Sequence, residues 1–335
     1  MMSRLFCTVL LFLLFLPSAA QQNLTVMFYN TENLFDPSDD PDKDDDDFTP
    51  QGDYHWTSGR YFDKLDAVSK VIAAADDEVC PALVGLCEVE NDKVLTDLTG
   101  RSALRQAGYR YVMTDSPDRR GIDVALMYRR ADFRLLSYCS IRVDLNGKGS
   151  KPTRDVLHVT GRIASGDTLD VYVCHWPSRI GGEKETEHLR MRAARAVRTS
   201  VDSVFAARRK PYVIIMGDLN EGPSCQAVVS GLAAEPFSRG CSLDDCSLVT
   251  LMDALDDGSY RYDGFWDCYD QFIVSSGLLN GLGCTELESF RVMKDGFLLE
   301  DDNMFGGVKP WRTYNGRRYQ GGFSDHLPVL MRLSY

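Results

Sequence analysis

The sequence predicts a layered α/β fold, because two kinds of pattern alternate along the chain. Two stretches carry apolar residues at helical spacing, Tyr61–Ala75 and Glu183–Arg209, and each is expected to form an amphipathic helix. Around them lie short apolar runs rich in Val, Ile, Leu and Tyr, the pattern of buried strands. Such mixing of strands and helices is typical of layered α/β proteins. The runs are Leu24–Tyr29, Ala82–Cys87, Ile122–Tyr128, Val156–Val159, Leu169–Cys174, Tyr212–Met216, Gln271–Val274 and Leu327–Leu333.

The first twenty residues have the pattern of a secretory signal sequence. Arg4 supplies a positive start, Leu5–Leu16 an apolar segment, and Ser18–Ala20 the small residues before a cut ahead of Gln21. We therefore expect a secreted or periplasmic protein without stable membrane insertion. The alternative is an uncleaved anchor, although the apolar run is short for a bilayer span.

Residues 21–335 are expected to form one domain. They contain no internal repeat and no linker rich in Pro, Gly or Ser that would divide them. The hydrophobic content of 44% is enough for a well-packed interior. The sequence leaves the oligomeric state open.

The acidic balance weakens the case for a nucleic-acid-binding protein. The formal net charge of −12 becomes −13 if Arg4 is lost with the signal, and such a chain should not attract nucleic acid through bulk charge. A local groove stays open as an alternative, with aromatic side chains that could stack on bases. A plainer interpretation is that the basic residues lie on solvated helix faces and that the aromatic residues are structural. The candidate residues for such a groove are Arg119, Arg120, Arg179, Lys184, Arg190, Arg192, Trp176, Trp266 and Trp311.

The cysteines do not indicate a disulfide framework. Ten are present, nine of them after residue 20, and an odd number cannot all pair. Cys87 and Cys174 lie in apolar runs and are expected to be buried thiols. Cys241 and Cys246 flank a loop and could bridge in an oxidising compartment.

The segment Asp36–Asp47 contains eight aspartates. A solvated loop is the plainer interpretation. A calcium site is an alternative, since hard cations prefer clustered carboxylates, but the segment lacks the central glycine and terminal glutamate of a calcium loop. A third alternative is that some of these aspartates line the rim of an active site.

Five short polar segments each lie at the end of an apolar run, where ligands gather in layered α/β folds. They combine carboxylates, amides and two histidines. Carboxylate oxygens hold Mg²⁺ or Mn²⁺, amides donate hydrogen bonds to phosphate, and histidine stabilises or protonates. Together these groups indicate metal-assisted attack on phosphorus. The segments are Tyr29–Asn33, Leu86–Asn91, Cys174–Arg179, Gly217–Asn220 and Ser324–Pro328.

The order of these residues resembles the endonuclease/exonuclease/phosphatase superfamily, which includes pancreatic deoxyribonuclease, neutral sphingomyelinases and inositol-polyphosphate 5-phosphatases. Secreted members of Bacteroidetes type are similar in a YNxENLFD motif, here Tyr29–Asp36, and in an acidic insert before a tryptophan, here Trp56. The resemblance implies a four-layer α/β sandwich like that of deoxyribonuclease I, with two packed, mainly antiparallel sheets flanked by helices. The residues that carry it are Asn30, Glu88, His175, Asp218, Asn220, Asp270 and Ser324-Asp325-His326.

The resemblance also implies roles by position. Glu88 would bind catalytic Mg²⁺ (or Mn²⁺), with Asn30 close by and Asp325 at the metal or its water shell. Asp218 would orient or deprotonate the attacking water, and Asn220 would hold the phosphate and the water. His326 would stabilise the pentacovalent phosphorus, Asp270 would orient His326, and His175 would contact phosphate or assist the leaving group.

Two positions depart from the family pattern. Cys87 stands where the family often has glutamine before the metal-binding glutamate. Asp123 stands on a strand that often offers Tyr or Asn to phosphate, and a carboxylate there needs a cation. We expect Asp123 either to bind a second metal or to face Arg119 or Arg120.

The functional hypothesis is therefore a metal-dependent phosphoesterase that uses activated water on a phosphodiester or phosphomonoester. The substrate alternatives are nucleic acid, which would make it a nuclease, and a small or lipid phosphoester such as a phospholipid or inositol phosphate. Alternatives from other classes are an inactive secreted binding protein and a calcium-dependent adhesion module. The intact set of metal- and water-handling residues argues against the first of these two.

Overall fold

The computed structural model describes residues 23–76, 79–145, 152–238, 246–252, 255, 257–282 and 290–334. The predicted signal sequence and Cys241 lie outside these ranges, so the signal and the bridge to Cys246 stay predictions. No described helix is long and apolar enough to cross a membrane.

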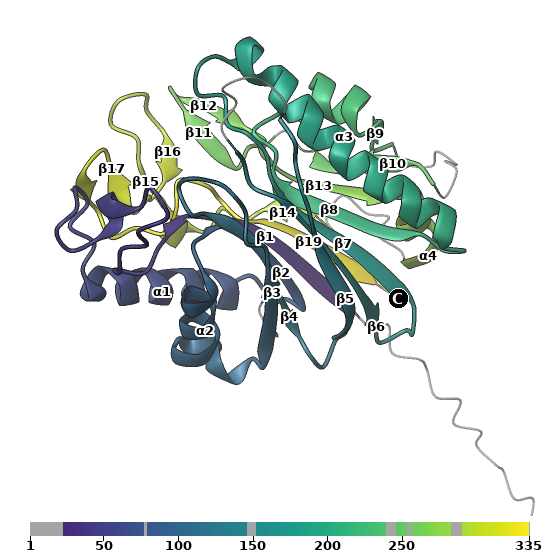
Figure 1. Cartoon of the computed structure of the whole chain (residues 1–335), viewed down its shortest axis with the longest axis horizontal. Coiled ribbons are helices and arrows are strands. Elements are labelled where there is room, and N and C mark those ends of the chain that lie inside the picture. Colours follow the sequence, from purple (N-terminus) through teal and green to yellow (C-terminus); the bar gives the residue numbers. More distant parts are fainter. Residues whose placement is uncertain are drawn as a thin grey trace, which may run out of the picture.

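Two large sheets form the centre of the molecule (Figure 1). Within them three pairs are parallel, β1–β2, β7–β8 and β9–β10, and the other pairs are antiparallel. The first sheet has the order β14 (Phe290–Val292), β19 (Val329–Ser334), β1 (Asn23–Leu34), β2 (Leu83–Val89), β4 (Asp123–Arg129) and β3 (Tyr109–Met113). The second has the order β5 (Phe133–Ile141), β6 (Val156–Ile163), β7 (Thr168–His175), β8 (Tyr212–Asp218), β13 (Asp270–Ser275), β10 (Leu248–Thr250) and β9 (Ala234–Pro236).

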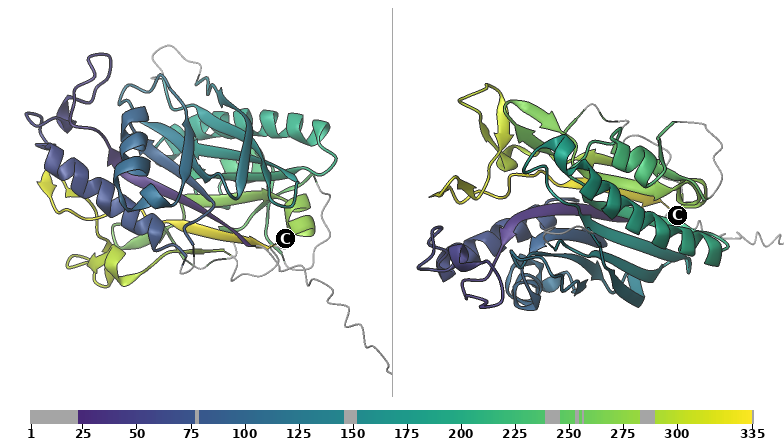
Figure 2. Two further views of the ribbon diagram at one scale, coloured as in Figure 1. Left: turned by 90° about the horizontal axis from the view of Figure 1, so that it is seen from below. Right: turned by 45° about the horizontal axis from the view of Figure 1, so that its top comes forward.

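Helices cover the outer faces of this pair of sheets (Figures 1 and 2). α1 (Ser58–Ala73) and α2 (Asp92–Arg101) lie against the first sheet, and α3 (Glu183–Ala207) lies against the second. A short α4 (Ser276–Leu282) follows β13 directly. The predicted four-layer sandwich with mainly antiparallel sheets is confirmed.

The two sheets pack closely enough that the backbone of Gly85 lies against a side chain of the opposite sheet. A Cβ at Gly85 on β2 would lie 2.9 Å from the sulfur of Met216 on β8 and 3.1 Å from the ring of Phe28. Gly85 therefore makes room for Met216 from the opposite sheet. This contact lies close to the ends of both strands, where the candidate site residues follow.

Every apolar run predicted as a strand lies on a strand, and both predicted helices are present. Three larger elements were not predicted, namely α2, β3 and β5. β5 is an edge strand whose side chains are mostly exposed, so it lacks the apolar signature of a buried strand. Short helices lie in the connections between the larger elements: the 3-10 helices η1 (Asp46–Phe48), η2 (Ala103–Gln106) and η6 (Gly296–Leu298), and the π-helix η3 (Ala227–Gly231). Three small hairpins lie there as well: β11–β12 (Tyr260–Tyr262, Phe265–Asp267), β15–β16 (Leu299–Asp301, Val308–Pro310) and β17–β18 (Tyr314–Asn315, Arg318–Tyr319).

Cys87 and Cys174 are fully buried free thiols, as predicted. Burial raises the pKa of Cys174 to about 12 and that of Cys87 well above its ordinary value. Both therefore stay protonated near neutral pH and act as small apolar side chains.

Asp170, a fully buried carboxylate on β7, ties that strand to its neighbours. It accepts hydrogen bonds from His158 Nε2 (3.0 Å) and Thr160 Oγ1 (2.6 Å) on β6 and from Arg208 Nε (3.0 Å) just after α3. Burial by itself would raise the pKa of Asp170, but the bonds from His158, Arg208 and Thr160 outweigh it and lower the pKa.

We expect Asp170→Asn to lower the free energy of unfolding by about 2 kcal/mol at neutral pH. The folded state lowers the pKa of this carboxyl below its ordinary value of 3.8. The carboxylate therefore stabilises the folded protein at any pH above 3.8, and this stabilisation is lost as the pH falls below that value. The deficit of the variant should therefore shrink in acid. Urea unfolding across pH measures it, with Asp167→Asn in the neighbouring turn as the control. A deficit that is equal at acid and neutral pH would contradict this assignment.

Candidate active site

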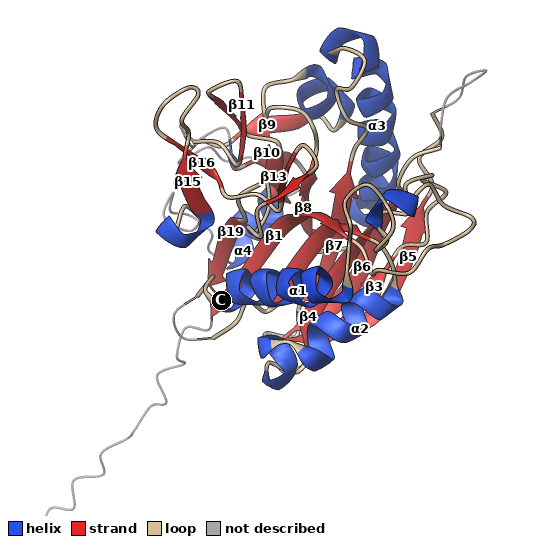
Figure 3. Cartoon of the chain, turned by 90° about the vertical axis from the view of Figure 1, so that its left-hand side faces the viewer, coloured by secondary structure: helices blue, strands red, loops and turns tan. Residues whose placement is uncertain are grey.

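The predicted site residues converge on one cleft. β1 and β2 are parallel neighbours in one sheet, and β7 and β8 are parallel neighbours in the other. The ends of these four strands meet at one end of the sandwich, together with the start of β13 and the loop before β19 (Figure 3). The cleft there has a volume of about 1140 Å³. Its lining includes Glu88, His175, Asp218, Asn220, Asp325 and His326.

Asp218 at the end of β8 is the centre of the site. Its Oδ2 accepts a hydrogen bond from Asn30 Nδ2 (3.1 Å) and lies 3.8 Å from Nε2 of both His175 and His326. Its Oδ1 accepts from the backbone N–H of Asn220 (2.9 Å). Asn220 has a left-handed backbone (φ 50°), a conformation that asparagine adopts more readily than most residues.

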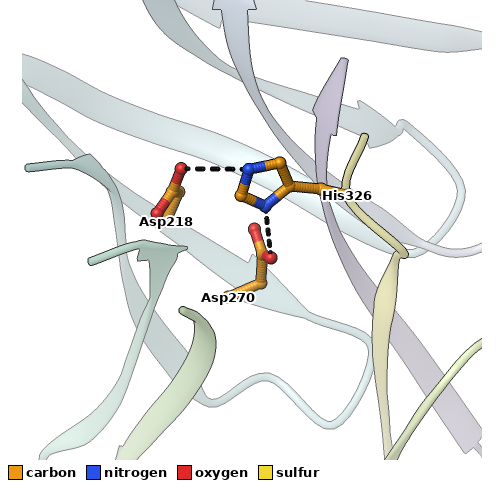
Figure 4. Close-up of side chains that lie close together, drawn as sticks. All are labelled: Asp218, Asp270 and His326. Carbon is orange, nitrogen blue, oxygen red and sulfur yellow. Dashed lines mark hydrogen bonds and ion pairs between the residues drawn. The ribbon is translucent and has the colours of Figure 1, made fainter. Parts of the chain in front are cut away.

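His326 and Asp270 form a buried pair (Figure 4). Nδ1 of His326 lies 2.7 Å from Oδ2 of Asp270, which also accepts from the hydroxyl of Ser259 (2.5 Å). This contact fixes the ring so that its Nε2 faces Asp218. Ser324 holds the loop in place, since its hydroxyl donates to the backbone oxygen of Asn30 (2.7 Å) and accepts from the N–H of His326 (3.1 Å).

The two histidines are held in opposite protonation states. Burial by itself would lower the pKa of His326, but Asp270 and Asp218 raise it well above its ordinary value, so His326 is an imidazolium. Burial lowers the pKa of His175, and the nearby Arg154 and Arg120 lower it further, so His175 is neutral. The site thus has one charged and one neutral imidazole facing the same carboxylate.

The pKa of Asp218 is shifted toward neutrality. Burial raises it to about 6, with Asp270 and Glu88 adding to the shift and His326 opposing it. A carboxylate in this range is suited to accept a proton near neutral pH.

Glu88 ends β2 at a bulge and has a left-handed backbone (φ 59°). Its Oε2 accepts from the backbone N–H of Asn33 (2.9 Å), and its Oε1 lies 3.9 Å from Nε2 of His175. Glu32 and Asn33 are also left-handed, with φ of 51° and 56°. Such strained backbone concentrates at functional sites, where the surrounding structure compensates for it.

Asp325 belongs to a charge network that extends to the first helix. Its Oδ2 accepts from Arg312 (2.8 Å), whose Nε lies 3.4 Å from Glu32 Oε1. Oε2 of Glu32 lies 3.9 Å from Nζ of Lys64, a buried residue of α1. Burial lowers the pKa of Lys64 to about 8, while Glu32 and Asp325 oppose the shift. Two acids and two bases thus compensate one another beside the cleft.

The residues present fit a divalent cation of the hard class. Glu88, Asp218 and Asp325 present carboxylates to the cleft, the ligands that Mg²⁺ and Mn²⁺ prefer. One group among the described residues, Asp218, Asp270 and His326, has ligand atoms within 4.8 Å of one another. Within this group, His326 and Asp270 are already bonded to each other at 2.7 Å. The amide oxygen of Asn30 accepts from the N–H of Glu32 (3.0 Å), and its nitrogen faces Asp218.

Two of the predicted nucleic-acid contacts lie inside the protein. Arg190 is fully buried and bonds to Glu221, Thr186 and two backbone oxygens. Trp176 is 1% exposed. Neither is available to a nucleic acid, because Arg190 lies on the buried face of α3 and Trp176 belongs to the apolar cluster that this face contacts. Arg190 shares that face with Ala193, Ala194 and Val197, a spacing that could have indicated its burial.

Asp123 faces neither Arg119 nor Arg120. It is buried and accepts hydrogen bonds from the hydroxyls of Thr114 and Ser116 and from the N–H of Ser116 (3.0 Å). It belongs to no group of metal-ligand geometry among the described residues. Asp123 therefore joins β4 to the end of β3.

The site residues predicted from the sequence do not include Lys64, Glu32 and Arg312. Lys64 lies on the apolar face of its helix, four residues before Val68 and seven before Val71. A charged residue in that stripe is a signal of a buried ion pair. Nothing local marks Arg312, because its partners come from β1 and from the loop before β19.

The chain belongs to the endonuclease/exonuclease/phosphatase family, whose model matches residues 25–335. It is accordingly a hydrolase of phosphoric esters, in a family that depends on divalent metal ions. No curated protein sequence matches the chain.

Solved structures share the fold at low identity. An endonuclease/exonuclease/phosphatase family protein from Bacteroides thetaiotaomicron is 16% identical with a TM-score of 0.57, over 94% of this chain and 98% of that one. The mannosyl-6-phosphatase Bt3783 of the same organism is 15% identical with a TM-score of 0.58, over 93% and 100%. Truncated TDP2 from Caenorhabditis elegans is 14% identical with a TM-score of 0.56, over 93% and 98%.

We expect Asp270→Asn to lower the pKa of His326, because Asp270 is the strongest group that raises it. An NMR titration of the imidazoles in the metal-free protein measures this directly. His175 should stay neutral at pH 7 in both proteins. Asp267→Asn, a carboxylate of the same cleft, is the control. If wild-type His326 is neutral at pH 7, the assignment of the charged imidazole is wrong.

Proposed function

We propose that the protein is an exported phosphoesterase that depends on Mg²⁺ or Mn²⁺ and hydrolyses a small phosphomonoester or phosphodiester with water. The observation that carries this proposal is the arrangement at Asp218. One buried carboxylate with a raised pKa faces a charged and a neutral imidazole at 3.8 Å, next to the Glu88 carboxylate.

These residues supply the parts that hydrolysis at phosphorus needs. Asp218 accepts the proton of the attacking water, and Asn30 and Asn220 hold its two oxygens in position. The imidazolium of His326 stabilises negative charge that develops on the phosphoryl oxygens, and Asp270 keeps it charged and oriented. Neutral His175 contacts the phosphate or assists the leaving group.

Glu88, with Asn30 and Asp325 nearby, would hold the cation. When bound, it would neutralise charge on the phosphoryl oxygen and on the leaving oxygen. Among the described residues, the arginine that pairs with this carboxylate is Arg120, at 3.8 Å.

The charges of the cleft favour a small phosphoester over a nucleic acid. Its carboxylates outnumber its arginines, and all four arginines have acidic partners. Arg119 pairs with Asp44, Arg120 with Glu88, Arg154 with Asp118, and Arg179 with Glu183 and Glu221. A strand of nucleic acid needs a row of unpaired basic groups. The fold is shared with a structure named as a mannosyl-6-phosphatase, which supports including sugar phosphates among the substrates.

We expect Glu88→Gln to reduce Mg²⁺-dependent hydrolysis about a thousandfold, because the metal loses its main carboxylate. The measurement is a panel of sugar phosphates, inositol phosphates, a bis-aryl phosphodiester, sphingomyelin, RNA and plasmid DNA. Glu90→Gln is the matched control, since burial raises the pKa of Glu90 to about 8 and leaves it largely protonated at neutral pH. Full activity of Glu88→Gln would refute the metal assignment, and hydrolysis of the nucleic acids alone would refute the small-substrate proposal.

A further inference from the structure

A second, smaller pocket adjoins the catalytic cleft. It has a volume of about 210 Å³ and four aromatic walls, Phe48, Tyr54, Trp56 and Tyr314. Trp56 and Tyr314 are buried and form its floor, whereas Phe48 and Tyr54 are partly exposed at its rim. The volume suits one small ring, not a peptide or a base pair.

The walls come from two distant parts of the chain. Phe48, Tyr54 and Trp56 follow the acidic run Asp36–Asp47, and Tyr314 lies on β17. These segments lie side by side at the end of the molecule where α1 begins (Figure 1). Phe48 and Tyr54 stack at 4.7 Å, and the rings of Tyr54 and Tyr314 meet edge to face at 4.8 Å. The walls are therefore fixed before any ligand binds.

The acidic run holds this segment against the rest of the cleft. Asp44 pairs with Arg119 (3.2 Å), and its backbone N–H donates to the oxygen of Arg119 (2.6 Å). Lys43 donates to the oxygen of Ser116 (3.2 Å). At the other end, Arg60 of α1 donates to the oxygens of Tyr54 and His55 (2.6 and 3.0 Å).

The remaining lining of the pocket is polar and belongs to the catalytic network. Asn33 lines it, and the N–H of Asn33 donates to the Glu88 carboxylate. Asp325 lines both the pocket and the cleft and directly precedes His326. Glu32 and Arg312 complete the polar side. The pocket and the catalytic cleft therefore share a wall at Asp325.

The chemistry of the lining selects the kind of group. Phe48 is stacked between Phe35 (4.4 Å) and Tyr54 (4.7 Å), and Trp56 is buried. The partly exposed ring of Tyr54 is therefore the aromatic group that can pack on the C–H face of a sugar or on a base. The carboxylates and the Asn33 amide accept hydrogen bonds from hydroxyls, and the Arg312 guanidinium donates to ring or hydroxyl oxygens. An acyl chain would cover these charged groups without offering them any hydrogen bond, at a cost in binding free energy.

From this lining we infer that the pocket of Phe48, Tyr54, Trp56 and Tyr314 binds the hydroxyl-bearing ring of a substrate whose phosphate occupies the Asp218–His326 centre. The role of the pocket in turnover rests on the proposed function. The ring can belong to a hexose phosphate or to a nucleotide, which share this chemistry.

Saturation-transfer NMR on the full-length protein tests the pocket without turnover. The probes are methyl glucopyranoside and adenosine, with glycerol as the acyclic comparison. We expect at least one ring probe to receive saturation from the wild type, with glycerol receiving none. Tyr54→Ala should weaken that binding about tenfold, whereas Tyr54→Phe keeps the ring and should keep the binding. Tyr138→Ala, on the exposed edge strand β5, is the matched control.

The outcomes separate the pocket from the proposed function. Saturation of the hexoside identifies a sugar phosphate as the source of the ring, and saturation of adenosine alone identifies a nucleotide. A ring probe that binds a protein without phosphoesterase activity would keep the pocket and refute the proposed function. If no ring probe binds, or if Tyr54→Ala folds and binds like the wild type, the inference is wrong even where Glu88-dependent hydrolysis is found.

In turnover, Tyr54→Ala should lower kcat/KM for the preferred ring phosphate about tenfold relative to glycerol phosphate, mainly through KM. An unchanged ratio between the two substrates would overturn the inference. Near-ultraviolet circular dichroism checks that the variant is folded.

Discussion

The face-to-face packing of the two sheets is the constraint on which the rest of the structure depends. β2 and β8 approach so closely that Gly85 has no side chain where Met216 crosses from the other sheet. Because β1–β2 and β7–β8 are parallel pairs in opposite sheets, this packing brings four strand ends to one place. The carboxylate, amide and imidazole groups that follow these strands then share one cleft without a long loop to position them.

Burial of so many charges in one place has to be compensated. Asp218, Asp270 and Glu32 are nearly inaccessible, and each has a partner from another element. His326 compensates the two aspartates, and Lys64 and Arg312 compensate Glu32 and Asp325. The cost of desolvating these groups is offset only when all partners are in place. The catalytic geometry and the stability of the first sheet are therefore coupled through the same contacts.

The central sandwich and the segments that connect its strands contribute different parts of the site. The strand ends of the sandwich carry the candidate site residues. The segment between β1 and α1 and the hairpins near the C-terminus form the walls around them. Loops of this kind can change without disturbing the strands, so they are the part of such a protein that selects a substrate.

Several features of this protein follow from the sequence by itself. Strands such as Tyr212–Asp218 are buried on both faces and read as continuous apolar runs, and the amphipathic period marks α1 and α3. The strand ends, and with them Glu88, His175, Asp218 and His326, can be placed from these patterns because each signal is local. The order of these residues along the chain also indicates the family.

Other features depend on partners that are distant in sequence. The edge strand β5 lacks an apolar pattern because most of its side chains are exposed, and Arg190 and Trp176 are buried only because α3 packs against the second sheet. Asp123 turns to Thr114 and Ser116 and away from the arginines, a choice made by the pairing of β3 with β4. The opposite protonation of His175 and His326 arises from burial and from charges on five separate segments. Local sequence determined where the strands and their polar ends are, whereas the tertiary structure decided which charges meet, because desolvation and Coulomb interaction act through space and not along the chain.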